Sequence, residues 1–282
     1  MSTFRAALIQ MTSSRSVADN VATMDRLVRA AAAGGATYVQ TPETTGIMDE
    51  DPRRLFETLT GEAGDATLAH GRRLAREFGL HLHIGSLAIK VGDGTKAANR
   101  AFVIDPAGEI VARYDKIHLF DVQLANGEVY RESARYVAGD EAVTVDLPFA
   151  RLGLTICYDL RFPHLFRTLA KDGGAEVLTV PAAFTRPTGE AHWHTLLRAR
   201  AIETGCWVLA AAQAGLHENG RETYGHSLAI DPWGRLVAEG GIEPGVIFAD
   251  VDTGEVAAVR GRVPALTHDR PFKLEATGRV GS

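Results

Sequence analysis

The sequence has few cysteines, no long apolar run and no excess of basic charge. Cys157 and Cys206 are the only cysteines among 282 residues, so no disulfide framework can support the fold. No stretch approaches the roughly 18 consecutive apolar residues of a membrane span, and the N-terminus MSTFRAALIQ lacks the pattern of a secretory signal. We therefore expect a protein of the reducing cytoplasm, in which a cysteine thiol stays free for chemistry.

The charge balance excludes further classes of partner. The formal net charge is -5, with 45% hydrophobic and 23% charged residues. This is ordinary globular composition rather than the composition of a disordered chain. It gives no electrostatic reason to expect nucleic acid or a membrane surface as a partner.

Two segments of the chain resemble two later ones. Residues 26–43 and 167–184 both read as a helix, then Gly-Gly-Ala, then a short run that ends at a proline. Residues 102–112 and 227–238 both read as a strand, an Asp-Pro-x-Gly turn and a strand, with proline and glycine where a tight turn favours them. The chain is therefore predicted to contain two related halves that differ in loop length.

Each half has the predicted order strand, helix, strand, helix, strands. Two such halves, about 4–112 and 150–238, would each bury one face of a sheet beneath two helices. Packing the two remaining sheet faces together gives a four-layer α-β-β-α sandwich in a single α/β domain of residues 1–282. The alternative is one continuous doubly wound sheet. The hairpins favour the sandwich because they add antiparallel strands to both halves.

Cys157 is the first candidate for chemistry. It ends the apolar run LGLTI and precedes the predicted start of a helix. A side chain on such a turn is held beside free backbone N–H groups and the positive end of a helix. This setting is expected to lower the thiol pKa and to supply donors to an oxyanion. A buried core cysteine is the alternative, and it is the favoured interpretation of Cys206.

Two charged residues stand where solvated side chains are unusual. Glu43 follows the predicted strand 38–40, at the carboxyl end where open α/β sheets bind ligands. Partial desolvation is expected to raise the pKa of Glu43 enough to accept a thiol proton. Lys116 is bracketed by apolar residues in RYDKIHLF (113–120) and would need a buried partner. The alternatives are a solvated loop glutamate and a lysine that extends to solvent from a strand end.

Histidines offer the main alternative chemistry, a metal-dependent hydrolase. His81 and His83 lie on one face of a predicted strand, a spacing that can bind zinc, but no third ligand is near. His192 and His194 point to different faces of a predicted helix. We therefore expect neither a metal nor another cofactor.

Segments along nearly the whole chain resemble the nitrilase superfamily of carbon–nitrogen hydrolases. The matching segments are TPE (41–43), RYDKIHLF (113–120), LTICYDLRFP (154–163), PAAF (181–184), AHWHTLLRARAIET (191–204) and GHSLAIDPWG (225–234). The resemblance implies the α-β-β-α sandwich and a catalytic triad of Glu43, Lys116 and Cys157. It also implies a second glutamate, assigned to Glu132 in YRES, with the nearby Glu128 as the alternative.

The resemblance is strongest to the Nit-type amidases. It implies cysteine-dependent cleavage of the terminal amide of a small carboxylate-bearing substrate, either deaminated glutathione or an ω-amide such as α-ketoglutaramate, through a thioester and with release of ammonia. Hydrolysis of N-carbamoyl amino acids or of nitriles is the alternative within the family, and a non-catalytic interaction module is a further one. In the family, C-terminal tails comparable to residues 263–280 cross to a partner subunit, which implies a homodimer.

Other residues are expected to bind the substrate. The backbone N–H of Tyr158 would share the oxyanion with Lys116. Phe184 and Thr185 follow the neighbouring strand and are expected to line the pocket together with the loop 44–50.

A substrate carboxylate needs a cation, and a bidentate arginine suits it best. Arg161 is the candidate, with Arg186 and Lys90 as alternatives. An internal ion pair with Asp159 is the competing interpretation of Arg161.

Overall fold

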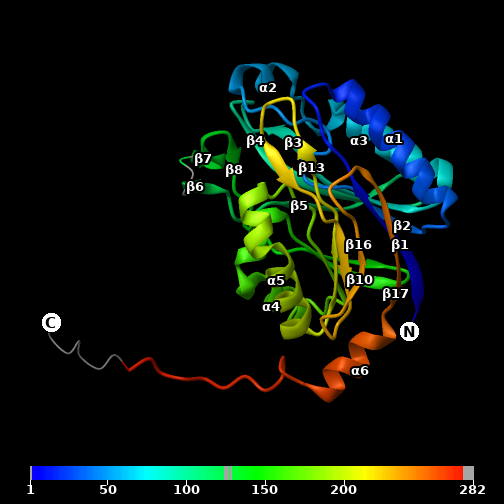
Figure 1. The fold of residues 1–282 in the computed structure, drawn as a ribbon, viewed down its shortest axis with the longest axis vertical. Coiled ribbons are helices and arrows are strands. Elements are labelled where there is room, and N and C mark those ends of the chain that lie inside the picture. Colours follow the sequence, from blue (N-terminus) through cyan, green and yellow to red (C-terminus); the bar gives the residue numbers. More distant parts are fainter. Residues whose placement is uncertain (1, 124–126, 128, 276–282) are drawn as a thin grey trace, which may run out of the picture.

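Two β-sheets lie face to face at the centre of the molecule, and helices cover their outer faces (Figure 1). The computed structural model describes residues 2–123, 127 and 129–275. The first sheet contains, in spatial order, β17 (Gly245–Asp252), β1 (Thr3–Gln10), β2 (Tyr38–Gln40), β3 (His81–Val91), β4 (Lys96–Ile104) and β5 (Ile110–Asp115), with β8 (Tyr136–Val137) beside β4. The second contains β16 (Leu236–Glu239), β15 (Leu228–Ile230), β12 (Trp207–Ala210), β11 (Val177–Thr179), β10 (Ala150–Leu154) and β9 (Thr144–Leu147).

Four helices form the outer layers. The first sheet is covered by α1 (Val17–Ala33) and α3 (Ala66–Phe78), and the second by α4 (Pro163–Lys171) and α5 (Arg186–Thr204). The predicted four-layer sandwich is confirmed, and the alternative of one continuous doubly wound sheet is wrong.

The remaining elements are short. They are α2 (Pro52–Thr58), α6 (Gly254–Arg262), the 3-10 turns η1 (Glu62–Gly64), η2 (Glu132–Ala134) and η3 (Cys157–Arg161), and the small hairpins β6 (Asp121–Gln123) with β7 (Val129–Arg131) and β13 (Ala214–Leu216) with β14 (Glu222–Tyr224). Among the described helices, none is both long and apolar enough to cross a membrane.

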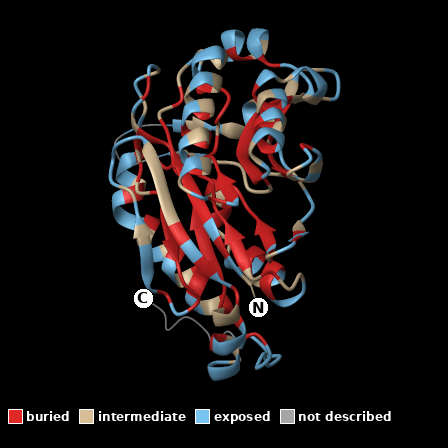
Figure 2. Ribbon diagram, turned by 90° about the vertical axis from the view of Figure 1, so that its right-hand side faces the viewer, coloured by how far each residue is buried: buried red, intermediate tan, exposed pale blue. Residues whose placement is uncertain are grey.

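The alternation of side chains along β1 shows why the sheets stack. Ala6 and Leu8 pack into the core between the two sheets, whereas Ala7 and Ile9 pack beneath α1 and α3. Both faces of a central strand are therefore buried, as a period of two requires when each face meets another layer. Figure 2 shows these strands buried and the outer sides of the helices exposed.

The two sheets repeat one connectivity. In the first, β1, β2 and β3 run parallel, and β4 and β5 follow antiparallel. In the second, β10, β11 and β12 run parallel, and β15 and β16 follow antiparallel. An antiparallel strand also flanks the start of each series, β17 beside β1 and β9 beside β10.

Matching turns close the two predicted hairpins. Asp105 accepts hydrogen bonds from the backbone N–H groups two and four residues later, and Asp231 does the same. Gly108 (φ 78°) and Gly234 (φ 86°) adopt the left-handed conformation that such a turn needs. The Asp-Pro-x-Gly sequence therefore folds identically in both sheets.

Strand β17 and helix α6 follow the second repeated segment and were not predicted. Strand β17 pairs with β1, whose residues lie more than 200 positions earlier in the chain. After α6, residues 264–275 form no helix or strand. Leu266 still packs into the core and Asp269 pairs with Arg167 and Lys171 of α4, and only beyond Asp269 does the described chain lead away from the body (Figure 1). Phe272 and Leu274 on this tail are each 92% exposed.

Candidate active site

All eight residues selected from the sequence line one pocket. They are Glu43, Lys116, Glu132, Cys157, Tyr158, Arg161, Phe184 and Thr185. Lys90 and Arg186 do not line it, and Arg186 pairs instead with Glu190 at 2.9 Å and with Glu222 at 2.8 Å. Glu128 lies outside the described residues.

The pocket lies where strands of both sheets end. Glu43 stands three residues past β2, and Cys157 stands three residues past β10. The residues that follow a parallel strand meet at one edge of a sheet, and here the edges of two sheets adjoin. The site therefore combines side chains from both sheets.

The nucleophile candidate sits in a strained conformation. Cys157 has a φ of 50°, in the region that residues other than glycine rarely adopt, and its N–H donates to the carbonyl of Pro181 at 2.9 Å. Burial, followed by the negative charge of Glu43, raises the pKa of the Cys157 thiol well above its ordinary value. The expected lowering of this pKa is therefore wrong, because the side chain is only 7% exposed and faces a carboxylate. The resting residue is a thiol.

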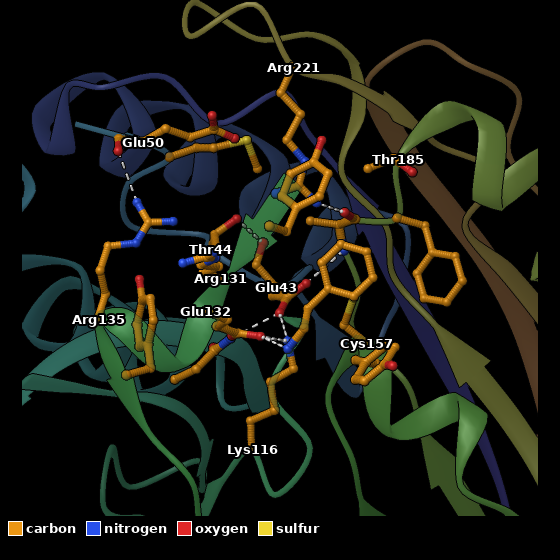
Figure 3. A pocket seen from close by; sticks show the side chains of 18 of the residues that line it. Glu43, Thr44, Glu50, Lys116, Arg131, Glu132, Arg135, Cys157, Thr185 and Arg221 are labelled. Atoms are coloured by element: carbon orange, nitrogen blue, oxygen red, sulfur yellow. Dashed lines mark hydrogen bonds and ion pairs between the residues drawn. The ribbon is translucent and has the colours of Figure 1, made fainter. Parts of the chain in front are cut away.

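The carboxylate of Glu43 is held by donors on both oxygens. Oε1 accepts from Lys116 Nζ and Asn99 Nδ2, each at 2.9 Å, and Oε2 accepts from the backbone N–H of Ala183 at 2.9 Å (Figure 3). The negative charge of this carboxylate acts on the neighbouring Cys157 thiol. Glu43 therefore contacts Lys116 directly and lies beside Cys157, the third proposed triad member.

The charge state of Glu43 differs from the prediction. Burial alone would raise its pKa, but the Lys116 charge and the hydrogen bond from Lys116 outweigh burial and lower the pKa. The expected rise is wrong because the sequence did not show that an ammonium group touches the carboxylate. Glu43 is ionised and can accept a proton.

Lys116 is buried between two carboxylates. Its side chain is 2% exposed, and Nζ lies 2.9 Å from Glu43 Oε1 and 2.9 Å from Glu132 Oε2. Burial opposes its charge, but Glu132, Glu43 and the neighbouring thiol raise the pKa of Lys116 well above its ordinary value. The group therefore stays an ammonium that can stabilise negative charge.

Asn99 on β4 links the two glutamates and was not predicted. Its Nδ2 donates to Glu43 Oε1 at 2.9 Å and to Glu132 Oε1 at 3.1 Å. Glu132 also accepts from the N–H of Phe120 at 2.6 Å. A single asparagine within a strand pattern gives no sequence signal.

Asp159 braces the turn that carries Cys157. It accepts from the Tyr114 hydroxyl at 2.7 Å, the His118 N–H at 3.0 Å and the Ile156 N–H at 2.9 Å. Asp159 thereby fastens the Cys157 turn to the segment around Lys116.

Arg161 is not an internal ion-pair partner of Asp159. Within the described part of the chain Arg161 contacts no carboxylate, and its guanidinium lies 5.4 Å from the ring centre of Phe184 and 5.9 Å from that of Tyr158. The competing interpretation of this residue is therefore wrong, and its charge faces the pocket.

The histidines do not form the metal site that the alternative chemistry needs. His83 is buried against the Tyr38 hydroxyl at 2.9 Å, and burial lowers its pKa to about 3. Among the described residues, three potential ligands meet only at His194, His226 and Glu239, whose ligand atoms lie within 4.8 Å of one another. These three residues do not line the pocket.

Comparison with known proteins extends these observations. A family model described as "Carbon-nitrogen hydrolase" matches residues 5–261. A Synechocystis protein named deaminated glutathione amidase is 41% identical over 271 residues, which are 95% of this chain and 98% of that protein. The crystal structure of the C. elegans NitFhit protein has a TM-score of 0.89 at 37% identity, covering 96% of this chain and 66% of NitFhit. A variant of an amidase from Nesterenkonia sp. AN1, with acrylamide added at its active site cysteine, has a TM-score of 0.77 at 28% identity, covering 93% of this chain and 98% of that one.

Proposed function

The chain belongs to the carbon–nitrogen hydrolase family, and on this premise we propose that it cleaves the amide of a small carboxylate-bearing substrate through a thioester on Cys157. The observation that carries the proposal is the position of the Glu43 carboxylate, which accepts a hydrogen bond from the Lys116 ammonium and lies in the same pocket beside the Cys157 thiol. The name of the Synechocystis relative supports deaminated glutathione as the substrate. An ω-amide such as α-ketoglutaramate has the same acyl half and is the second candidate.

Acylation begins with a proton transfer to Glu43. Because the Cys157 thiol is protonated at rest and lies beside this ionised carboxylate, Glu43 takes its proton as the sulfur attacks the amide carbonyl carbon. The C=O electron pair moves onto oxygen. Lys116 and the N–H of Tyr158, which lies in the first turn of η3, stabilise this oxyanion.

The leaving nitrogen then takes the proton from Glu43, and the C–N bond breaks. The amine released is ammonia from an ω-amide, as expected from the sequence, but it is a dipeptide from deaminated glutathione, for which the expectation of ammonia was wrong. A water molecule gives one proton to Glu43 and adds its oxygen to the thioester carbon. The C–S bond breaks, the acid is released, and the proton returns to Cys157. Glu132 keeps Lys116 charged and oriented through two contacts at 3.1 and 2.9 Å.

Arg161 suits the carboxylate of the acyl half. It is a pocket cation without a carboxylate partner in the described residues, and the rings of Phe184 and Tyr158 restrict its position. Thr185 lies beside Phe184 at the start of α5, where its hydroxyl meets that of Thr188 at 2.8 Å. These side chains would orient the acyl chain so that its carbonyl faces Cys157.

The tail supports a homodimer. Phe272 and Leu274 are almost wholly exposed, which is unfavourable for two large apolar side chains unless another surface covers them. We infer that the tail packs on a second copy in the cytoplasm. Light scattering of the full chain and of a chain truncated after Arg270, which keeps the buried Leu266 and the ion pairs of Asp269, tests this. A dimer that becomes a monomer on truncation is expected, and a monomeric full chain contradicts the proposal.

A substrate panel tests the activity. We expect kcat/KM to be highest for deaminated glutathione, lower for α-ketoglutaramate, and negligible for an N-carbamoyl amino acid and a simple nitrile. Preference for either of the last two would overturn the proposed substrate class. Inhibition by a metal chelator would contradict the cysteine mechanism.

A further inference from the structure

Arg221 enters the pocket from the turn between β13 and β14 and was not selected from the sequence. Its Nη2 donates to the carbonyl of Ala183, and its guanidinium lies 5.3 Å from the ring centre of Tyr130. Its Nε is buried and has no hydrogen-bond partner among the described residues. Arg221 is thus a fixed cation with a donor still to be satisfied.

Arg221 forms no ion pair with the described carboxylates, although its charge helps to lower the pKa of Glu43. In the described ranges no carboxylate lies within ion-pair distance of it, in contrast to the surface arginine Arg186. The same turn holds a second buried donor without a described partner, Asn219 Nδ2. Unsatisfied buried donors are costly, and a carboxylate is the acceptor that best matches a guanidinium.

Ala183 fixes the position of Arg221 relative to the chemistry. The N–H of Ala183 donates to Glu43 Oε2, and its carbonyl accepts from Arg221. Figure 3 shows Glu43 between Lys116 on one side and Arg221 on the other. In the proposed function Glu43 protonates the leaving nitrogen, so Arg221 lies on the side of the leaving amine.

Arg161 reaches the pocket from another element, the turn η3. It follows Cys157 on η3 and faces the rings of Phe184 and Tyr158. Arg161 and Arg221 enter the pocket from different elements, and neither pairs with a described carboxylate, so each is available to one half of an amide. Such a pocket fits a substrate with a carboxylate at both ends.

We propose that Arg221 forms an anion subsite for a carboxylate carried by the leaving amine, which makes amides of amino acids or short peptides the preferred substrate class. This inference rests on the proposed function and deepens it. In this inference, Arg221 makes the enzyme prefer substrates with a peptide-like leaving group over substrates that release ammonia.

The test compares three substrates with one acyl half. They are deaminated glutathione, the same compound with its C-terminal carboxylate converted to a carboxamide, and α-ketoglutaramate. In Arg221→Met we expect kcat/KM for deaminated glutathione to fall about 10- to 100-fold relative to the carboxamide, mostly through KM, as for loss of a charged hydrogen bond. Any effect of the lost charge on Glu43 acts on all three substrates and cancels in this ratio.

Arg135→Met is the matched control. Arg135 lines the same pocket but donates to the Glu50 carbonyl at 3.0 Å on another wall. We expect it to leave the ratio unchanged, whereas Arg221→Lys should restore the ratio only in part. Equal losses for all three substrates in Arg221→Met, or the same change of ratio in Arg135→Met, would overturn the subsite. A wild-type enzyme inactive on all three would instead refute the proposed function.

Discussion

Asp159 accepts a hydrogen bond from the Tyr114 hydroxyl at 2.7 Å, and this contact joins the strand that leads to Lys116 to the turn that carries Cys157. Tyr114→Phe should therefore lower both stability and turnover. A hydrogen bond to a buried charged group is worth about 1.5–3 kcal/mol, and we expect urea unfolding to show a loss of this size. Tyr224→Phe is the control, because among the described residues the Tyr224 hydroxyl has no hydrogen-bond partner. Similar losses in both variants would contradict the bracing role.

The two cysteines should respond in opposite ways to substitution. Cys157→Ala removes the nucleophile, so turnover should fall by more than the roughly 10²–10³-fold that loss of a single oxyanion donor costs. Cys206 is fully buried, and its thiol faces the Ala175 carbonyl at 3.2 Å, so Cys206→Ala should keep turnover. Steady-state assays and iodoacetamide labelling check this. Substantial activity in Cys157→Ala would refute the nucleophile assignment.

Glu132→Gln should shift the basic limb of the pH profile to lower pH. The charge of Glu132 raises the pKa of Lys116, so its removal lets the ammonium lose its proton more readily. We also expect kcat to fall by about 10²–10³-fold, because the oxyanion partner is less firmly held. The measurement is kcat/KM between pH 6 and 11. A basic limb that does not move would show that Lys116 is not the group titrating there.

Asn99→Leu should shift the acidic limb to higher pH. Asn99 stabilises the ionised form of Glu43 through a bond at 2.9 Å, so its loss raises the pKa of that carboxyl. Turnover near pH 7 should fall about 10-fold, the effect of losing one hydrogen bond to a charged group. An acidic limb identical to the wild type would mean that Asn99 does not act on the base.

His83 should make the fold sensitive to mild acid. Burial lowers its folded-state pKa from 6.5 to about 3, so between these values the unfolded chain binds a proton that the folded chain does not. Stability is therefore lost as the pH falls below about 6.5, and His83 alone costs about 2 kcal/mol between pH 7 and pH 5. His83→Gln should remove this dependence. Urea unfolding of both proteins at the two pH values measures it, and parallel losses would contradict it.

The sequence predicted the parts of the site that follow local rules. Cys157 and Glu43 stand just past short apolar strands, and the topology of α/β sheets brings such positions together. Lys116 was identifiable because a charge inside an apolar segment needs a partner. The resemblance to a known family then assigned Glu43, Lys116 and Cys157 to one catalytic triad.

Other site residues had no local signal. Arg221 lies in the polar turn HENGRET, which reads as an ordinary exposed loop, and only the packing of β13 and β14 over the pocket gives it a role. Asn99 is recognisable only after two carboxylates are known to converge on it. The pKa of Glu43 was mispredicted because it depends on Lys116, more than 70 residues away along the chain. The pKa of Cys157 was mispredicted because burial, followed by the charge of Glu43, raises it.

Strand β17 was missed because its pairing is not local. It joins β1 across almost the whole length of the chain, and no neighbouring hairpin or turn marks it. The repeated segments, in contrast, carry their own turn chemistry at Asp105 and Asp231. Periodicity and turns therefore predict the repeated strands of each sheet, but they do not predict β17, which pairs with β1 from the far end of the chain.

The hydrogen bond from Ala183 to Glu43 crosses from one sheet to the other. Neither half of the repeated architecture therefore contains a complete site. In the second half, Pro181-Ala182 occupies the position of Pro42-Glu43, so only the first half supplies the catalytic glutamate. A displacement of about 1 Å between the sheets would separate base from nucleophile, and misplacements of that size cost about 10²-fold in rate. Catalytic activity therefore depends on the relative position of the two sheets. Mild denaturant should abolish activity at concentrations below those that unfold either sheet.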